Sequence, residues 1–225
     1  MHNASMIADR KAFILANTRL KPAPHVPEIS LYVADESVAI WQKTEEELEQ
    51  IGLPPPYWAF AWAGGQALAR YLLDHPDEVS GKRVLDLAAG SGLVGIAAAM
   101  AGGSPVTAVD IDAFTQAAID LNAEANDAYV DVLVLDMLDH PAPPVARYDI
   151  ILVGDLFYER DTAARALAFL DRHAAVGSRV LIGDPGRTYL PKDRLTRLAE
   201  YSVPVTRELE DMEIKRTSVW ALVAT

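Results

Sequence analysis

The chain has 225 residues, a net charge of −12 at pH 7 and no cysteine. Hydrophobic residues make up 51% of it and charged residues 23%, which is enough apolar material for a folded core. We expect one domain with an extension, because domains usually contain roughly 100–200 residues. The acidic balance argues against a nucleic-acid binder, since phosphate backbones attract basic surfaces. The lack of cysteine excludes a disulfide framework, a thiol nucleophile and a cysteine-ligated metal site.

Two uncharged stretches, residues 51–69 and 87–109, raise the question of a membrane span. The prolines at 54–56 interrupt the first, and several glycines and Pro105 interrupt the second. A spanning helix needs ~20 mainly apolar residues without a break, so we expect no membrane association. The N-terminus lacks the apolar core of a signal peptide. Its basic residues fit an organelle-targeting segment or, as we expect, a short helix with basic ends.

The composition shifts near residue 27 from a basic stretch to an acidic one. Thr44, followed by glutamates at 45, 46, 47 and 49, is typical of a helix N-cap with acids near the positive end of the dipole. These acids fit a solvated helix face or, alternatively, a landing site for a basic partner. We divide the chain into an N-terminal extension of helices and short strands, residues 1–55, and a main domain, residues 56–225.

From residue 81 onward, short apolar runs alternate with helical patterns. The expected strands are residues 84–87, 106–109, 132–135, 150–153 and 180–182, followed by two tail strands at 203–209 and 218–223. The expected helices are residues 93–101, 113–126, 161–175 and 191–200. This alternation predicts an α/β fold with a mostly parallel sheet and helices on both faces. The two tail strands, joined by a short charged turn, predict an antiparallel edge.

Each of the five expected parallel strands has an acid near its carboxyl end. These acids are Asp86, Asp110, Asp136, Asp155 and Asp184. Ligands of open α/β sheets bind outside the carboxyl ends of the strands, which favours a functional role for Asp136 and Asp155. An acid inside an apolar strand, such as Asp86, must be hydrogen-bonded or functional. Asp112 and Asp161 each directly precede a helix, so we expect them to be helix caps.

The segment from Gly90 to Gly95 matches the G-x-G-x-x-G pattern, and Asp110 follows at about the spacing of a ribose-binding acid. The pattern alone would suggest NAD. However, a pyrophosphate needs backbone amides without nearby acids, and the strand-end aspartates would crowd it. The same acids suit a cationic ligand without phosphate, such as S-adenosylmethionine (SAM), whose ribose diol still needs an acidic acceptor.

Other chemistries find little support in the sequence. The five histidines are scattered and form no H-E-x-x-H pattern, so we expect no metal site. The sequence contains neither the G-x-S-x-G of α/β-hydrolases nor a P-loop lysine motif.

An aromatic segment, residues 56–65, precedes the first expected parallel strand and contains Trp58 and Trp62. It could be a plug of aromatic side chains over one face of the sheet. It could also be a lid on the cofactor and an aromatic wall for a cationic side chain. The two interpretations are compatible. Gly64 and Gly65 would permit a close backbone approach or an unusual turn.

Several stretches resemble a known family. Residues 84–92, Val-Leu-Asp-Leu-Ala-Ala-Gly-Ser-Gly, resemble the SAM-binding motif of seven-β-strand methyltransferases, with Ala88 where many members have glycine. Residues 155–158, Asp-Leu-Phe-Tyr, resemble the Asp-x-x-Tyr motif of the protein-lysine methyltransferase branch. Residues 58–69, 71–74, 154–158 and 181–187 are similar to those of the branch that acts on the electron transfer flavoprotein β-subunit. The likeness spans about residues 27–223.

The resemblance implies a Rossmann-like seven-stranded fold in residues 56–225, SAM as methyl donor, and a lysine of the electron transfer flavoprotein β-subunit as acceptor. The implied cofactor contacts are Trp62, Asp86, Gly90, Gly92, Asp110, Ile111, Asp136 and Met137. Trp58 and Phe157 are the expected substrate contacts, and Asp155 and Tyr158 the expected catalytic residues. We expect the protein in the cytoplasm, or in the mitochondrial matrix of a eukaryotic source.

Methyl transfer asks the protein to align the reactants and to supply a neutral amine. Asp155 could orient the incoming lysine ammonium, and Tyr158 could hold its nitrogen. The alternatives are a small-molecule methyltransferase on the same fold, an NAD-dependent oxidoreductase, and a catalytically silent SAM-binding module. A small-molecule enzyme would need a long inserted cap, for which the gaps between the expected strands are short.

Overall fold

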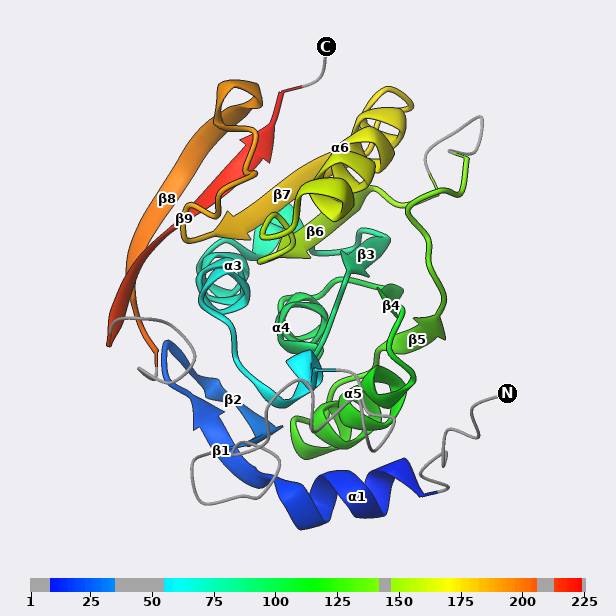
Figure 1. Ribbon diagram of the computed structural model, residues 1–225, viewed down its shortest axis with the longest axis vertical. Coiled ribbons are helices and arrows are strands. Elements are labelled where there is room, and N and C mark those ends of the chain that lie inside the picture. Colours follow the sequence, from blue (N-terminus) through cyan, green and yellow to red (C-terminus); the bar gives the residue numbers. More distant parts are fainter. Residues whose placement is uncertain (1–8, 35–54, 142–146, 206–212, 224–225) are drawn as a thin grey trace.

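The computed structural model describes residues 9–34, 55–141, 147–205 and 213–223. Its centre is a seven-stranded sheet with the order β5-β4-β3-β6-β7-β9-β8 (Figure 1). The strands are β3 Val84–Leu87, β4 Val106–Asp110, β5 Asp131–Val134, β6 Ile150–Gly154, β7 Arg179–Asp184, β8 Leu195–Pro204 and β9 Ile214–Leu222. β3 to β7 are parallel, and β9 lies antiparallel between β7 and β8. This confirms the predicted fold class and its antiparallel edge.

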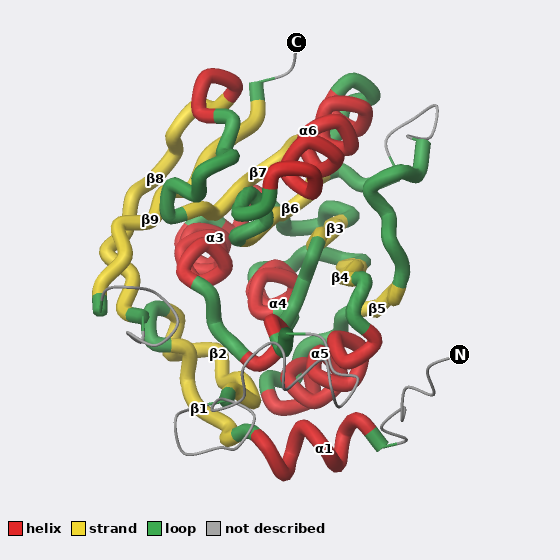
Figure 2. The backbone as a smooth tube through the Cα atoms, viewed as in Figure 1, coloured by secondary structure: helices red, strands yellow, loops and turns green. Residues whose placement is uncertain are grey.

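Helices cover both faces of the sheet (Figure 2). α3 (Ala63–Asp74) and α4 (Leu93–Met100) pack on one face, and α6 (Arg160–Ala174) packs on the other. Successive side chains of a strand point to opposite faces. In β3, Leu85 therefore joins the core beneath α6, whereas Val84 joins the core beneath α3 and α4. By the same alternation, the side chain of Asp86 faces α4.

The described part of the N-terminal extension packs on α5 (Ala113–Ala125). Its elements are α1 (Arg10–Asn17), which confirms the expected short helix, and a hairpin of β1 (Arg19–Ala23) and β2 (Val26–Val33). Phe13 of α1 meets Phe114 of α5 edge to face, with ring centroids 5.4 Å apart. The backbone N–H of Tyr32 in β2 donates to the side chain of Asn122 in α5 (2.7 Å). These contacts position α1 and the hairpin against the helix that follows β4.

The helix predicted at residues 191–200 is wrong. A short 3₁₀ turn, Lys192–Arg194, leads directly into β8, which pairs with β9 along its length. Residues 195–200 are compatible with a helix on local propensity, but pairing across the sheet overrides that weak preference. Ala199, Tyr201 and Val203 then alternate toward the core beneath α3. The last strand also begins at Ile214, earlier than predicted.

Three further points concern the helices. The predictions did not include α3, which begins only seven residues after the prolines that argued against a helix in residues 51–69. Asp161 is not the cap of α6. Glu159 is, and it accepts the backbone N–H groups of Asp161 and Thr162. The helix predicted after Thr44 falls outside the described residues.

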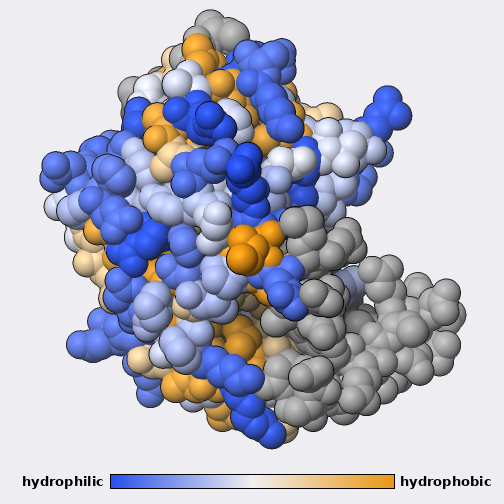
Figure 3. Space-filling view, turned by 90° about the vertical axis from the view of Figure 1, so that its left-hand side faces the viewer, coloured by the Kyte–Doolittle hydropathy of each residue, from blue (hydrophilic) through white to orange (hydrophobic). Residues whose placement is uncertain are grey.

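The surface shows both hydrophilic and hydrophobic side chains, as a chain with 23% charged and 51% hydrophobic residues should. Over the side of the molecule where β8 and β9 lie, hydrophobic side chains form small groups between hydrophilic ones (Figure 3). Among the described residues, no helix combines the length and hydropathy that crossing a membrane requires. Within those same residues, histidine and acidic side chains form no cluster that could hold a metal ion.

Candidate active site

A cavity of about 870 Å³ opens at the carboxyl ends of the parallel strands. Ten of the predicted site residues line it: Trp58, Trp62, Asp86, Gly90, Asp110, Ile111, Asp136, Met137, Asp155 and Tyr158. These residues come from the carboxyl-terminal ends of β3 and β4, from the turns after β3, β4, β5 and β6, and from the segment before α3. The fold therefore brings together residues that lie up to a hundred positions apart in the chain.

The glycine turn between β3 and α4 forms one wall of the cavity. Gly90 and Gly92 have positive φ angles of 52° and 79°, and Ala88 has a φ of 57°. A left-handed backbone costs a non-glycine residue about 1–2 kcal/mol, so Ala88 adopts a conformation that glycine would adopt more easily. Gly92 is not among the lining residues. A Cβ there would lie 2.7 Å from Cγ1 of Ile119, so this glycine serves the packing of the turn.

Asp86 ties the first strand to the helix after the turn. Its Oδ2 accepts the backbone N–H of Gly95 at 2.8 Å. The side chain is almost completely buried, and this burial raises its pKa to about 7, with a smaller contribution from the charge of Asp110. A cation placed in the cavity would favour the ionised form of this carboxyl.

Asp110 supports the glycine turn from the next strand. Its Oδ2 accepts the N–H of Gly90 at 2.9 Å, and its Oδ1 accepts the N–H of Asp112 at 3.0 Å. Asp112 in turn caps α5 by accepting the N–H of Phe114 at 2.9 Å, which confirms its predicted role. Ile111 between them is 73% exposed at the cavity rim.

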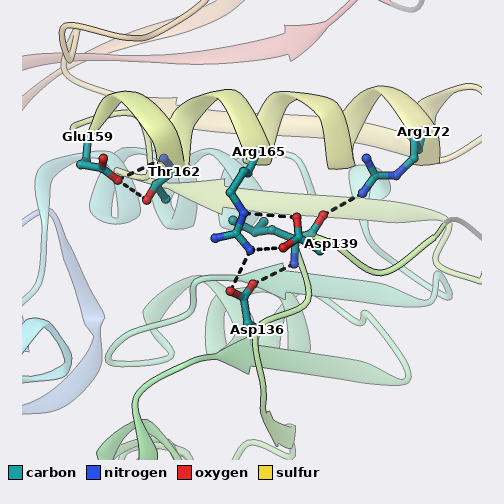
Figure 4. Close-up of polar contacts among 7 residues, drawn as sticks. Asp136, Asp139, Glu159, Thr162, Arg165 and Arg172 are labelled. Carbon is teal, nitrogen blue, oxygen red and sulfur yellow. Dashed lines mark hydrogen bonds and ion pairs between the residues drawn. The ribbon is translucent and has the colours of Figure 1, made fainter.

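Asp136, after β5, is held by an arginine that the sequence analysis did not single out. Figure 4 shows Arg165 reaching from α6 to both Asp136 and Asp139. The Nη2 atom of Arg165 lies 2.8 Å from Asp136 and 2.7 Å from Asp139. The hydrogen bond from Arg165 holds the pKa of Asp136 below its usual value. Met137 follows directly and also lines the cavity.

Asp155, after β6, is clamped from two directions. Its backbone φ is 55°, a left-handed conformation that aspartate and asparagine adopt more readily than most residues. Its Oδ2 accepts the N–H of Gly65 in α3 at 3.1 Å. Its Oδ1 accepts from Nη2 and Nε of Arg187 at 2.8 and 3.2 Å. With 8% of its surface exposed, this carboxylate is a buried partner of a guanidinium.

Asp184, the fifth strand-end acid, shapes a loop and is not among the residues lining the cavity. Its Oδ1 accepts the backbone N–H groups of Gly186 and Arg187 at 2.6 and 2.7 Å. Burial raises the pKa of Asp184 to about 6. The loop it holds delivers Arg187 to Asp155. Arg187 was not among the predicted site residues, although residues 181–187 carry part of the family resemblance.

Aromatic side chains form the remaining wall. The Nε1 of Trp62 donates to the backbone oxygen of Tyr57 (3.0 Å), and the Tyr57 ring lies 5.9 Å from the rings of both Trp62 and Tyr158. Trp58 is deeper and stacks on Phe114 at 5.5 Å. Burial, followed by the neighbouring Tyr57 and Asp110, raises the pKa of Tyr158 to about 12. The segment is thus both a packed plug and a cavity wall.

Phe157 is the predicted substrate contact that the structure does not bring to the cavity. Its side chain is fully buried in the core beneath α6. Residues 155–158 lie on a turn after a strand, and consecutive side chains there point in different directions. Asp155 and Tyr158 face the cavity while Phe157 anchors the turn in the core.

The lining fits a cationic ligand better than a phosphate. Five aspartates line the cavity: Asp86, Asp110, Asp112, Asp136 and Asp155. Two of the three lining arginines, Arg165 and Arg187, already form ion pairs with carboxylates. A pyrophosphate would meet an excess of negative charge, whereas a ligand with cationic groups and hydroxyls would find partners for both.

Comparisons with known proteins place the chain in a family. Residues 34–198 match a family model described as lysine methyltransferase. The electron transfer flavoprotein beta subunit lysine methyltransferases of Rattus norvegicus and Homo sapiens are both 37% identical over 93% of this chain. The match covers 83% and 80% of their lengths. The Caenorhabditis elegans homolog is 30% identical, over 85% of this chain and 87% of its own.

Solved structures share the fold at low identity. One is the magnesium protoporphyrin IX methyltransferase of Synechocystis with bound SAM, with a TM-score of 0.52 and 16% identity over 85% of this chain and 87% of that one. Another is the ribosomal protein L11 methylase of Lactobacillus delbrueckii, with a TM-score of 0.53 and 18% identity over 74% and 81% of the two chains. By the family match and the identity to its curated relatives, this chain belongs to the lysine methyltransferase family.

Proposed function

We propose that this protein transfers methyl groups from SAM to lysine side chains of the electron transfer flavoprotein β-subunit. The observation that carries the proposal is that one cavity is lined both by the glycine turn with Asp86 and Asp110 and by Asp155 and Tyr158. Family membership supplies the reaction class, and the names of the curated relatives support the choice of substrate.

The donor set of the cavity suits SAM. When bound, SAM supplies a methyl group on a positively charged sulfur that an amine can displace. Asp86 and the Gly90 turn would face its methionine part, and Asp110 would accept hydrogen bonds from the ribose hydroxyls. Asp136 and Met137 would contact the adenine. These assignments agree with the acidic lining, since charge-assisted hydrogen bonds to carboxylates are the stronger kind.

The other lining residues prepare the amine. Tyr158 is protonated at neutral pH and, with its pKa raised to about 12, stays so in alkaline solution, so its hydroxyl can both donate to and accept from a nitrogen. The rings of Tyr57, Trp62 and Tyr158 would surround that position with aromatic carbon once a substrate lysine enters. Desolvation disfavours the charged form of a lysine. Holding the amine in line with the methyl group lowers the barrier further by removing orientational freedom.

The choice of protein substrate rests on similarity across most of the chain. The relatives named for the electron transfer flavoprotein β-subunit match over 93% of this sequence. A match to the ribosomal protein L11 methyltransferase of Geotalea uraniireducens covers 48% of it. The longer matches therefore favour the flavoprotein β-subunit as the acceptor.

Two experiments test the proposal. Calorimetric titration with SAM and with NAD should give binding for SAM alone, and affinity for NAD without affinity for SAM would refute the cofactor assignment. Incubation with labelled SAM and a lysate of the source organism should then label a protein band that mass spectrometry identifies as the flavoprotein β-subunit. A labelled small molecule with no labelled protein would instead support a small-molecule methyltransferase.

A further inference from the structure

Arg187 lines the same cavity as Asp155 and forms an ion pair with it. Its guanidinium lines the cavity and lies 2.8 Å from Oδ1 of Asp155. It also lies 5.9 Å from the centre of the Trp62 ring, within reach of a cation–π interaction. The side chains of the pair are 21% and 9% exposed, so solvent screens their interaction only weakly.

The loop after β7 holds this guanidinium in place. Asp184 accepts the backbone N–H groups of Gly186 and Arg187, and Gly186 has a positive φ of 94°. Asp184 is itself buried at the end of β7. The buried acid therefore fixes the backbone from which the Arg187 side chain starts, and Asp155 and Trp62 fix its far end.

The pairing changes what Asp155 can do. An isolated carboxylate would stabilise a lysine ammonium and raise the pKa of that lysine above its value in water of about 10.4. That would oppose a reaction that needs the neutral amine. The positive charge of the Arg187 guanidinium offsets the negative charge of the Asp155 carboxylate. A lysine ammonium that approached the pair would also be repelled by the guanidinium. Because of this ion pair, we no longer expect Asp155 to attract a lysine ammonium.

Resting on the proposed function, we propose that Arg187 is a positioning residue that makes the lysine end of the cavity accept its substrate as the neutral amine. Asp155 and Arg187 then act as one unit, in which the carboxylate oxygen offers a hydrogen-bond acceptor while the guanidinium cancels its charge. No base has to take the proton inside the site, because the nearby guanidinium lowers the pKa of the bound lysine, which releases its proton to water before methyl transfer.

Other charged or titratable groups lie near this pair or near its neighbours. Asp184 interacts with Asp155 and Arg187, whereas Tyr57, Asp110 and Glu159 interact with Tyr158. The Nζ of Lys192 lies beside Gly186, the residue before Arg187. The pKa values of Tyr158 and Asp184, about 12 and about 6, lie outside the range in which a bound lysine should titrate. The remaining groups are the same in every variant described below, so a comparison between variants cancels their contribution.

The test is the pH dependence of the single-turnover methylation rate at saturating substrate, which reports the pKa of the bound amine. Arg187→Met removes the charge but keeps the length of the side chain. It should shift the midpoint upward by roughly one pH unit, so that the rate is about tenfold lower at neutral pH and recovers at high pH. Arg187→Lys keeps the charge and should keep the wild-type midpoint.

A purely structural role predicts a different result. Arg187→Met would then lower the rate by the same factor at every pH and leave the midpoint unchanged, which would overturn the proposal. If the lone Asp155 destabilises that variant, the double variant Asp155→Asn with Arg187→Met removes both charges, and its midpoint should return toward the wild-type value. A double variant that keeps a raised midpoint would also contradict the proposal. If the wild-type protein transfers no methyl group, the proposed function itself fails.

Discussion

Under the proposed function, we expect the reaction to depend on Asp155 most directly. Asparagine tolerates the same positive φ and can still accept the N–H of Gly65, so Asp155→Asn should keep the local backbone. It loses the charge that pairs with Arg187. We expect the methylation rate to fall roughly 100-fold, because a small misplacement of reacting groups costs about that factor. SAM affinity should fall only modestly.

Tyr158→Phe serves as the companion variant, because it removes one hydroxyl and leaves the ion pair intact. It should slow transfer less than Asp155→Asn does. The measurements are a melting curve, a SAM titration and a methylation rate on each preparation. Wild-type methylation by a stable, SAM-binding Asp155→Asn protein would remove Asp155 from the mechanism.

Asp110 should determine the affinity for SAM. Asp110→Ala removes the acceptor for the ribose and for the N–H of Gly90. A hydrogen bond to a charged group contributes about 1.5–3 kcal/mol, so we expect the Kd for SAM to rise roughly 10- to 100-fold in calorimetric titrations. Asp120→Ala is a matched control, since Asp120 forms an exposed ion pair with Lys11 on the outer side of α5. Equal Kd values for the two variants would reassign Asp110 to a structural role.

Asp86 should make the stability of the ligand-free protein depend on pH. Burial raises its folded-state pKa from 3.8 to about 7, so the folded state binds the proton more tightly than the unfolded state. The free energy of unfolding therefore contains a favourable contribution at low pH that is lost as pH rises from about 4 to about 7. Asp86→Asn mimics the protonated form and should flatten this slope in denaturant titrations. A slope identical to that of the wild type would contradict the buried, protonated state.

The residue types near the strand ends predicted most of the residues that line the cavity. They could not predict the direction in which each side chain points or the partners with which it pairs. The acids at or just after the ends of β3, β4, β5 and β6 could be assigned because parallel strands bring their carboxyl ends to one edge. Arg165 and Arg187 were missed because they come from α6 and from the loop after β7, and a lone arginine carries no local signal. Phe157 was misplaced because its neighbours in the same motif face the cavity.

At the scale of elements, the contact between α3 and β7 sets the position of the cavity wall. A Cβ on Gly64 would lie 2.2 Å from the backbone oxygen of Gly183 and 2.5 Å from Oδ2 of Asp155. Gly64→Ala should therefore lower the free energy of unfolding by about 1–3 kcal/mol, the usual cost of overpacking, and reduce methylation.

Gly65→Ala provides the control on the same helix. The nearest atom to its added Cβ would be Cγ2 of Val94 at 3.8 Å, an ordinary contact. Alanine is the better helix former, so the effect on the free energy of unfolding should stay within about 1 kcal/mol. Similar losses of stability in both variants, measured by denaturant titration, would show that the close backbone approach at Gly64 is not the cause.

The elements that sequence patterns predicted best are those with a strong local signal. The strands β3, β4 and β6 are short, mostly apolar runs, and α5 begins at a capping aspartate. α3 and β8 carry no such signal. The prolines before α3 concealed a helix that starts soon after them, and β8 is a strand because β9 pairs with it across the sheet. Pairing of that kind depends on the whole fold.

At the scale of the whole molecule, the architecture separates two tasks. Under the proposed function, the glycine turn and the acids at the ends of β3, β4 and β5 would face the cofactor, and the residues after β6 and β7 would face the amine. The N-terminal elements pack on α5, which begins at the cap next to Asp110. Both sets of residues open into the same cavity, which is the arrangement that transfer between two substrates requires.

Under the proposed function, the protein methylates a lysine of the electron transfer flavoprotein β-subunit, and the reaction takes place in this cavity. The most direct measurement incubates the purified protein with labelled SAM and the purified flavoprotein of the same organism, followed by mass spectrometry of the β-subunit. We predict methyl groups on lysine, appearing in proportion to enzyme and strongly reduced with the Asp155→Asn variant. An unmodified β-subunit in the presence of enzyme that demonstrably binds SAM would contradict the account.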